Sequence, residues 1–155
     1  MVASYQGKLM EPVKETYPIT ESFMSRSFVT VKPDTDIYEA MDILLENRIS
    51  GAMVVDDFGT LVGFISEKDC LKLTTSDSYE QSQHGGPVAQ YMTRRVVTIH
   101  TNMGLAQVAQ TFLKHPFRKL PVMERNRLVG VVRRRDVLEA IQDFFGKRTE
   151  YMRKH

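Results

Sequence analysis

The chain has 155 residues, of which 42% are hydrophobic, so it is long enough and apolar enough to fold around a core. Its 21 basic and 19 acidic residues leave a net charge of +2, which gives no global field favouring nucleic acid or a membrane surface. A single cysteine excludes an internal disulfide framework, and no apolar run approaches the roughly 18 residues of a membrane span. We therefore expect a soluble, cytoplasmic protein, with neither nucleic acid nor a membrane as its partner.

The first structured part of the chain predicts a short strand followed by a helix. Residues 28–31 are mostly β-branched, which is typical of a strand. Residues 33–36 then provide a turn and a helix cap. Apolar residues follow at the spacing of one helical face: Ile37, Ala40, Met41, Leu44 and Leu45.

A hairpin and a second helix complete this unit. Residues 52–55 and 61–65 predict two buried strands that return on each other through a tight turn at 56–59. A second helix is expected to open at Asp69, and its neighbour Cys70 is expected to be a small buried hydrophobe rather than a nucleophile. The unit is therefore read as β-α-β-β-α.

The whole pattern then occurs a second time. Leu105 lies 68 residues after Ile37 and opens an equivalent apolar helical face, whereas Gly130 lies 67 residues after Gly63, because the second hairpin turn is one residue shorter. Two copies of a β-α-β-β-α unit predict an α/β fold in which the copies pack together to cover their sheets. The expected divisions are an N-terminal arm (1–18), repeat 1 (19–73), a linker (74–87), repeat 2 (88–145) and a polar, basic tail (146–155).

These repeats resemble a tandem pair of CBS domains, also called a Bateman module. The signals are Phe23-Met24 and Tyr91-Met92 before the first strands, Leu120-Pro121-Val122, the hairpins, and the Gly-x-x-Ser-x-x-Asp motif from Gly63 to Asp69. The resemblance implies two repeats packed as a pseudo-two-fold disc with two clefts. It also implies an adenosine-containing ligand, which would be AMP, ADP, ATP or S-adenosylmethionine.

The resemblance further implies which residues bind this ligand. The motif Asp would hold the ribose hydroxyls, the motif Ser would hold phosphate at a helix start, and adenine would lie between backbone and apolar side chains. In repeat 1 the implied ligand-binding residues are Met24, Ser25, Val29, Ser50, Gly51, Ala52, Ser66, Lys68 and Asp69. In repeat 2 they are Met92, Thr93, Val97, Arg118, Lys119, Leu120, Pro121, Arg133, Arg135 and Asp136.

Both motifs leave alternatives open. Ser66 and Asp69 also have the spacing of a capping box, a purely structural device. Repeat 2 departs from the motif, because Arg133 stands where Ser or Thr is expected. An arginine there either meets a phosphate or leaves its cleft empty. The basic residues of repeat 2 nevertheless favour an anionic ligand: Arg118, Lys119, Arg133 and Arg135.

The sequence therefore predicts a stand-alone regulatory module without catalysis and without a metal site. The histidines show no metal-ligand spacing. We expect Asp69→Ala to abolish ligand binding with little effect on the fold. The alternative function is a protein-interaction or dimerisation module with degenerate clefts. A homodimer is expected through the helices after the hairpins, around residues 69–75 and 136–145, and the regulated partner protein is not identified.

Overall fold

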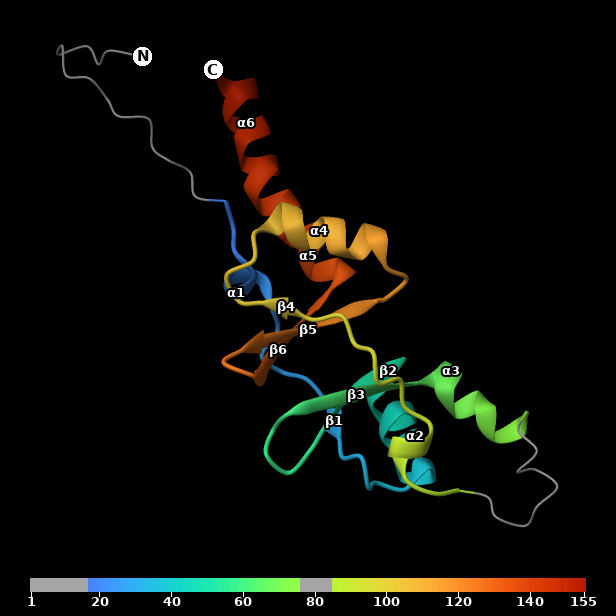
Figure 1. The fold of residues 1–155 in the computed structure, drawn as a ribbon. Coiled ribbons are helices and arrows are strands. Elements are labelled where there is room, and N and C mark those ends of the chain that lie inside the picture. Colours follow the sequence, from blue (N-terminus) through green and yellow to red (C-terminus); the bar gives the residue numbers. More distant parts are fainter. Residues whose placement is uncertain (1–16, 76–84) are drawn as a thin grey trace.

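The computed structural model describes residues 17–75 and 85–155, without the side chains of 147–149 and 151. Most of the expected N-terminal arm and linker lies outside these residues. The described chain forms two three-stranded sheets with helices on their outer faces (Figure 1). The α/β fold of two β-α-β-β-α units is therefore confirmed.

Repeat 1 has the predicted order of elements. Strand β1 (Thr30–Val31) pairs in parallel with β2 (Gly51–Val55), and β2 pairs antiparallel with β3 (Leu61–Ser66). Helix α2 (Ile37–Asn47) connects β1 to β2, and its N-cap Asp36 accepts a hydrogen bond from the Tyr38 N–H at 2.9 Å. Helix α3 (Glu67–Cys70) is short and continues as the 3-10 turn η1 (Leu71–Thr74).

Repeat 2 repeats this order and then extends it. Its elements are the 3-10 turn η3 (Val88–Gln90), β4 (Ile99–His100), α4 (Leu105–Lys114), β5 (Lys119–Glu124), β6 (Arg127–Arg133) and α5 (Arg134–Ile141). The last helix does not stop near residue 145. It passes through the π-helical turn η4 (Gln142–Gly146) into α6 (Lys147–Lys154), because Gly146 keeps a helical φ of −62° and no proline interrupts the chain.

The hairpin turns explain the change of repeat offset. In repeat 1, Asp56 accepts hydrogen bonds from the Phe58 and Thr60 N–H groups at 2.9 Å, and Gly59 closes the turn with a φ of +80°. In repeat 2, Arg125 and Asn126 both have positive φ and form a two-residue turn between Glu124 and Arg127. This shorter turn has no residue equivalent to Gly59.

The two repeats exchange their N-terminal segments. Helix α1 (Thr20–Phe23) lies against repeat 2, where the Thr20 N–H donates to the Met103 carbonyl at 2.9 Å (Figure 1). The equivalent Val88 N–H of repeat 2 donates to the Thr35 carbonyl of repeat 1 at 2.8 Å. Each hydrophobic core therefore contains side chains from both repeats, since Met92 packs in the core of repeat 1 and Met24 in that of repeat 2.

Two glycines permit this exchange. A Cβ on Gly63 would lie 2.6 Å from the Met92 sulfur and 2.9 Å from the Thr93 carbonyl oxygen. A Cβ on Gly130 would lie 2.8 Å from the Met24 sulfur and 2.9 Å from the carbonyl oxygen of the residue after Met24. Because β3 and β6 approach the exchanged segments this closely, neither position accommodates a larger residue without displacement of the backbone.

Candidate functional site

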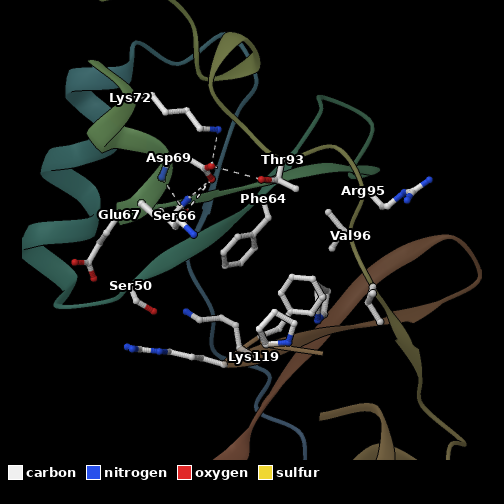
Figure 2. A pocket seen from close by; sticks show the side chains of 16 residues that line it. Ser50, Phe64, Ser66, Glu67, Asp69, Lys72, Thr93, Arg95, Val96 and Lys119 are labelled. Atoms are coloured by element: carbon white, nitrogen blue, oxygen red, sulfur yellow. Dashed lines mark hydrogen bonds and ion pairs between the residues drawn. The ribbon is translucent and has the colours of Figure 1, made fainter. Parts of the chain in front are cut away.

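A cleft of about 580 Å³ lies between the two repeats. One side comes from the end of β3 and from α3 of repeat 1, and the other from the start of β5 and the chain before it. The third contribution is the segment that leads into β4. The lining residues are Ser50, Phe64, Ser66, Glu67, Lys68, Asp69, Lys72, Thr93, Arg95, Val96, Val97, Pro116, Phe117, Arg118, Lys119 and Pro121 (Figure 2). This volume is that of a small-molecule site.

Asp69 is the most connected side chain of the cleft. Its Oδ2 accepts hydrogen bonds from the Ser66 N–H at 3.0 Å and the Ser66 hydroxyl at 2.9 Å. Its Oδ1 accepts from Lys72 Nζ at 3.1 Å and lies 3.5 Å from the Thr93 hydroxyl. The Ser66 hydroxyl in turn accepts from the Asp69 N–H at 3.1 Å, so the predicted capping box is present. The carboxylate is buried, with 6% of the residue exposed, and therefore has a fixed position.

Lys119 forms the opposite side of the cleft. Figure 2 shows it across from Ser66, with the Phe64 ring between them. The Lys119 ammonium group donates to the Gly51 carbonyl at 2.8 Å, which ties repeat 2 to repeat 1. Burial lowers the pKa of Lys119, and the charge of Arg133 lowers it further. A partly desolvated cation of this kind is well suited to an anionic group of a ligand, because a counter-charge would offset its desolvation.

The charge of the cleft is mainly positive. Its cations come from both repeats and from the connecting segment: Lys68, Lys72, Arg95, Arg118 and Lys119. The acidic lining residues are Glu67 and Asp69. Apolar surface between these charges comes from aromatic, proline and valine side chains, among them Phe64 and Phe117. The arrangement thus combines an aromatic and aliphatic surface with cations, which suits a molecule that has a flat apolar part and an anionic part.

The structure brings only part of the sequence-predicted set together. The predicted residues that line this cleft are Ser50, Ser66, Lys68, Asp69, Thr93, Val97, Arg118, Lys119 and Pro121. Thr93 reaches the cleft because its N–H and carbonyl exchange two 2.8 Å hydrogen bonds with Phe64 of β3. These residues share a site, and their contact with a ligand stays a prediction.

The other predicted residues lie elsewhere. Met92 packs against Gly63 of β3 and Met24 against Gly130 of β6. Ala52 and Leu120 are buried in the cores. Gly51 has no side chain to offer, and a Cβ at this position would collide with the Phe64 ring. Arg135 points to solvent and pairs with Glu139 at 3.2 Å. The remaining members, Ser25, Val29, Arg133 and Asp136, occupy the positions equivalent to Thr93, Val97, Ser66 and Asp69 in the other half of the module.

Several lining residues were missed from the sequence: Phe64, Glu67, Lys72, Arg95, Val96, Pro116 and Phe117. Most are next to predicted ones in the chain, and this adjacency was the available signal. Val96 precedes Val97, and Phe117 precedes Arg118. Lys72 was harder to find, because its approach to Asp69 depends on the helical turn that follows Ser66.

In the other half of the module, Arg133 takes the place of the serine. Its Nε donates to Asp136 Oδ2 at 3.1 Å and its Nη2 donates to Oδ1 at 2.9 Å, while its backbone N–H donates to Oδ2 at 2.8 Å. These hydrogen bonds raise the pKa of Arg133. Arginine has no acceptor, so only the Asp136 half of a capping box is formed here.

The CBS-domain family model matches residues 19–75 and 88–143, which are the two repeats. The chain belongs to the CBS-domain family. Among its relatives, the CBS domain-containing protein YhcV of Bacillus subtilis is 30% identical over 123 residues, which are 79% of this chain and 80% of that protein. The tandem CBS pair anticipated from the sequence is thus confirmed.

Solved CBS-pair structures have the same fold. The crystal structure of CBSX2 in complex with AMP gives a TM-score of 0.72 at 28% identity, over 81% of this chain and 96% of that one. CBSX2 is from Arabidopsis thaliana. The CBS domain pair of protein MJ0100, in complex with 5-methylthioadenosine and S-adenosyl-L-methionine, gives a TM-score of 0.66 at 28% identity, over 85% and 99% of the two chains.

Other relatives of this CBS pair are longer proteins. The chain spans 45% of an uncharacterized protein, MJ1225, of Methanocaldococcus jannaschii, and 26% of an inosine-5'-monophosphate dehydrogenase of Aquifex aeolicus. CBS domains therefore occur both in stand-alone proteins and within enzymes. Within residues 17–75 and 85–155, no helix is long and apolar enough to cross a membrane. The same residues contain no group of three His, Cys, Asp or Glu side chains that could hold a metal.

Proposed function

We propose that this CBS pair is a regulatory module that binds an adenosine-containing ligand in the cleft between its repeats, without catalysis. The observation that carries the proposal is the fixed Asp69 carboxylate, which faces a basic and partly aromatic surface across one cleft. A carboxylate accepts the two hydroxyl hydrogens of a ribose, and the cations suit a phosphate. The AMP and S-adenosyl-L-methionine complexes of the relatives support this ligand class.

The regulatory part of the proposal follows from the two sides of the cleft. Ser66 and Asp69 belong to repeat 1, whereas Arg118 and Lys119 belong to repeat 2. A ligand that contacts both sides favours one arrangement of the repeats over others. Such differential affinity is what a ligand needs in order to shift a conformational equilibrium.

A thermal-unfolding panel with AMP, ADP, ATP, S-adenosylmethionine, adenosine and GTP tests this proposal. A ligand at about 100 times its Kd adds about 2.7 kcal/mol to the free energy of unfolding. For a protein of this size, the expected rise in Tm is roughly 5–10 °C. A rise with adenine compounds and none with GTP supports the proposal. Folded protein whose Tm responds to no compound in the panel contradicts it.

The second candidate function is dimerisation or protein interaction, and two exposed leucines favour it. Leu71 after α3 and Leu138 on α5 are equivalent in the two repeats, and 65% and 66% of their surfaces are exposed. They lie in the segments that the sequence predicted for a homodimer. Matching apolar residues at pseudo-symmetric positions suit an isologous interface.

Sedimentation velocity on the double variant Leu71→Glu/Leu138→Glu tests this second candidate. We expect a parent dimer to become a monomer, since four buried charges would stand in one dimer interface. Phe58→Glu is the control, because Phe58 is exposed at the first hairpin turn, outside the predicted segments. A parent that sediments as a monomer, or a double variant that remains dimeric, contradicts the interface.

A further inference from the structure

The two repeats hold equivalent carboxylates that differ in what covers them. Asp69 and Asp136 are similarly buried, with 6% and 8% of their surfaces exposed, and each follows its hairpin at the same distance. Both accept a hydrogen bond from the backbone N–H three residues earlier. The difference between the two halves therefore arises from the surrounding side chains.

At Asp136 the covering group is a whole guanidinium. Arg133 contacts both carboxylate oxygens, through Nε at 3.1 Å and Nη2 at 2.9 Å. This bidentate geometry is the strongest that a carboxylate and a cation form, and one partner here is buried. A ribose would have to displace both contacts before its hydroxyls reached Asp136.

At Asp69 the covering groups are smaller or more easily moved. Ser66 contributes a hydroxyl, and the cation Lys72 makes one contact, at 3.1 Å. The two cations are similarly exposed, at 58% for Lys72 and 54% for Arg133, so the difference lies in the one contact of Lys72 against the two of Arg133. The position of Lys72 in repeat 2 is taken by Glu139, which pairs with Arg135 and not with Asp136. In repeat 1 the cation that pairs with the carboxylate follows it in the chain, at Lys72, whereas in repeat 2 it is Arg133, at the position of Ser66.

The residues across the cleft from each carboxylate also differ between the two halves. Asp69 has Arg118 and Lys119 across its cleft. The equivalent residues for the other half are Ser50 and Gly51, which carry no charge, and the Gly51 carbonyl already accepts the Lys119 ammonium. In the other half, Arg133 and Arg135 stand at the positions of Ser66 and Lys68, and they are paired with Asp136 and Glu139.

We infer that each chain takes one ligand, in the Asp69 cleft, because Arg133 occupies Asp136 from within and excludes a ribose there. The inference rests on the proposed function. Because a ligand would have to break two charge-assisted hydrogen bonds, its binding at Asp136 is weakened by roughly a hundredfold or more. Arg133 is thus the residue that sets the number of ligands per chain.

Equilibrium dialysis with AMP, ATP and S-adenosylmethionine as separate probes tests this inference. It compares the parent, Arg133→Ser, and the control Arg134→Ser, which removes the same charge from an exposed neighbour without a contact to Asp136. Each probe is raised to ten times the Kd of its first site for the parent and for both variants. We expect one bound molecule per chain for the parent and for Arg134→Ser, and a plateau approaching two for Arg133→Ser.

The outcomes separate the inference from the proposed function. Two molecules bound per parent chain overturn the inference alone. One molecule bound to Arg133→Ser at ten times the first Kd also overturns it, because Arg133 is then not the obstacle. No binding of any probe to the parent contradicts the proposed function, and the inference fails with it.

Discussion

Replacement of Gly63 by alanine tests the central packing feature of this module, the approach of each β-hairpin to the exchanged segment of the other repeat. The new Cβ would lie 2.6 Å from the Met92 sulfur and 2.9 Å from the Thr93 carbonyl oxygen. Met92 can adopt another rotamer, but the carbonyl belongs to backbone that is hydrogen-bonded to Phe64 at 2.8 Å. Thr93 and Phe64 must therefore separate.

The magnitude follows from this steric conflict. Overpacking of a well-packed site costs about 1–3 kcal/mol. At roughly 2–4 °C per kcal/mol for a protein of this size, the Tm of Gly63→Ala falls by about 2–12 °C. Because Thr93 and Phe64 both line the cleft, binding of an adenine nucleotide weakens as well.

The internal repeat supplies a matched control. Gly130→Ala meets the Met24 sulfur at 2.8 Å and a backbone carbonyl at 2.9 Å, so its loss of stability should be similar. Its affected segment lies outside the lining of the Asp69 cleft, so its affinity should stay near that of the parent. Urea unfolding and titration calorimetry measure the two quantities. A Gly63→Ala protein as stable as the parent, or equal losses of affinity in both variants, would refute this reasoning.

Three further substitutions test the site, and one labelling measurement tests the burial of Cys70. Asp69→Ala should abolish nucleotide binding in calorimetry. It should also lower the free energy of unfolding by about 1 kcal/mol or more, because the carboxylate caps α3. The control Asp136→Ala should lose comparable stability but keep the nucleotide affinity of the Asp69 cleft. Lys119→Met should weaken nucleotide binding about tenfold, with stability within about 1 kcal/mol of the parent. The pKa of Lys119 is lowered in the folded protein, so its charge disfavours folding at neutral pH. As the pH rises toward 10.5, Lys119 loses its proton first in the folded state, and the parent gains stability. The stability of Lys119→Met relative to the parent should therefore be highest at neutral pH and decline as the pH rises, which urea unfolding at several pH values measures. Cys70 is buried and burial raises its pKa, so Ellman's reagent should react with it only as fast as the protein opens; rapid labelling of the native protein would contradict its placement.

The Asp69 prediction differs from the one drawn from the sequence, which expected little effect on the fold. The spacing of Ser66 and Asp69 fitted a capping box and a ligand contact equally, and a spacing does not report burial. In the structure the carboxylate accepts hydrogen bonds from Ser66 and Lys72 and has almost no exposed surface. Its removal therefore leaves the half-buried Ser66 N–H and hydroxyl without this acceptor, which costs stability whether or not a ligand binds.

The elements and their duplication could be predicted from the amino-acid sequence alone. The signals are local or periodic: the apolar spacing from Ile37 to Leu45, the hairpin turns and the 68-residue offset. Such patterns can be recognised without knowing how the elements pack. The motif around Asp69 and the basic residues before Leu120 were likewise readable, because they lie at fixed places relative to a strand end. The cleft residues found from the sequence are those that follow this local pattern.

The packing of each N-terminal segment on the other repeat could not be predicted from the sequence, because it depends on contacts in the folded chain. The chain before β4 packs on β3 and carries Thr93 to Asp69, while the chain before β1 packs on β6, so contacts between residues far apart in the sequence create the cleft. The role of Arg133 was undecided for the same reason, because a side chain's partner depends on its rotamer and on the surrounding groups. Arg133 turns onto Asp136 because the adjacent buried carboxylate offers two acceptors, and no pattern in the sequence specifies that choice.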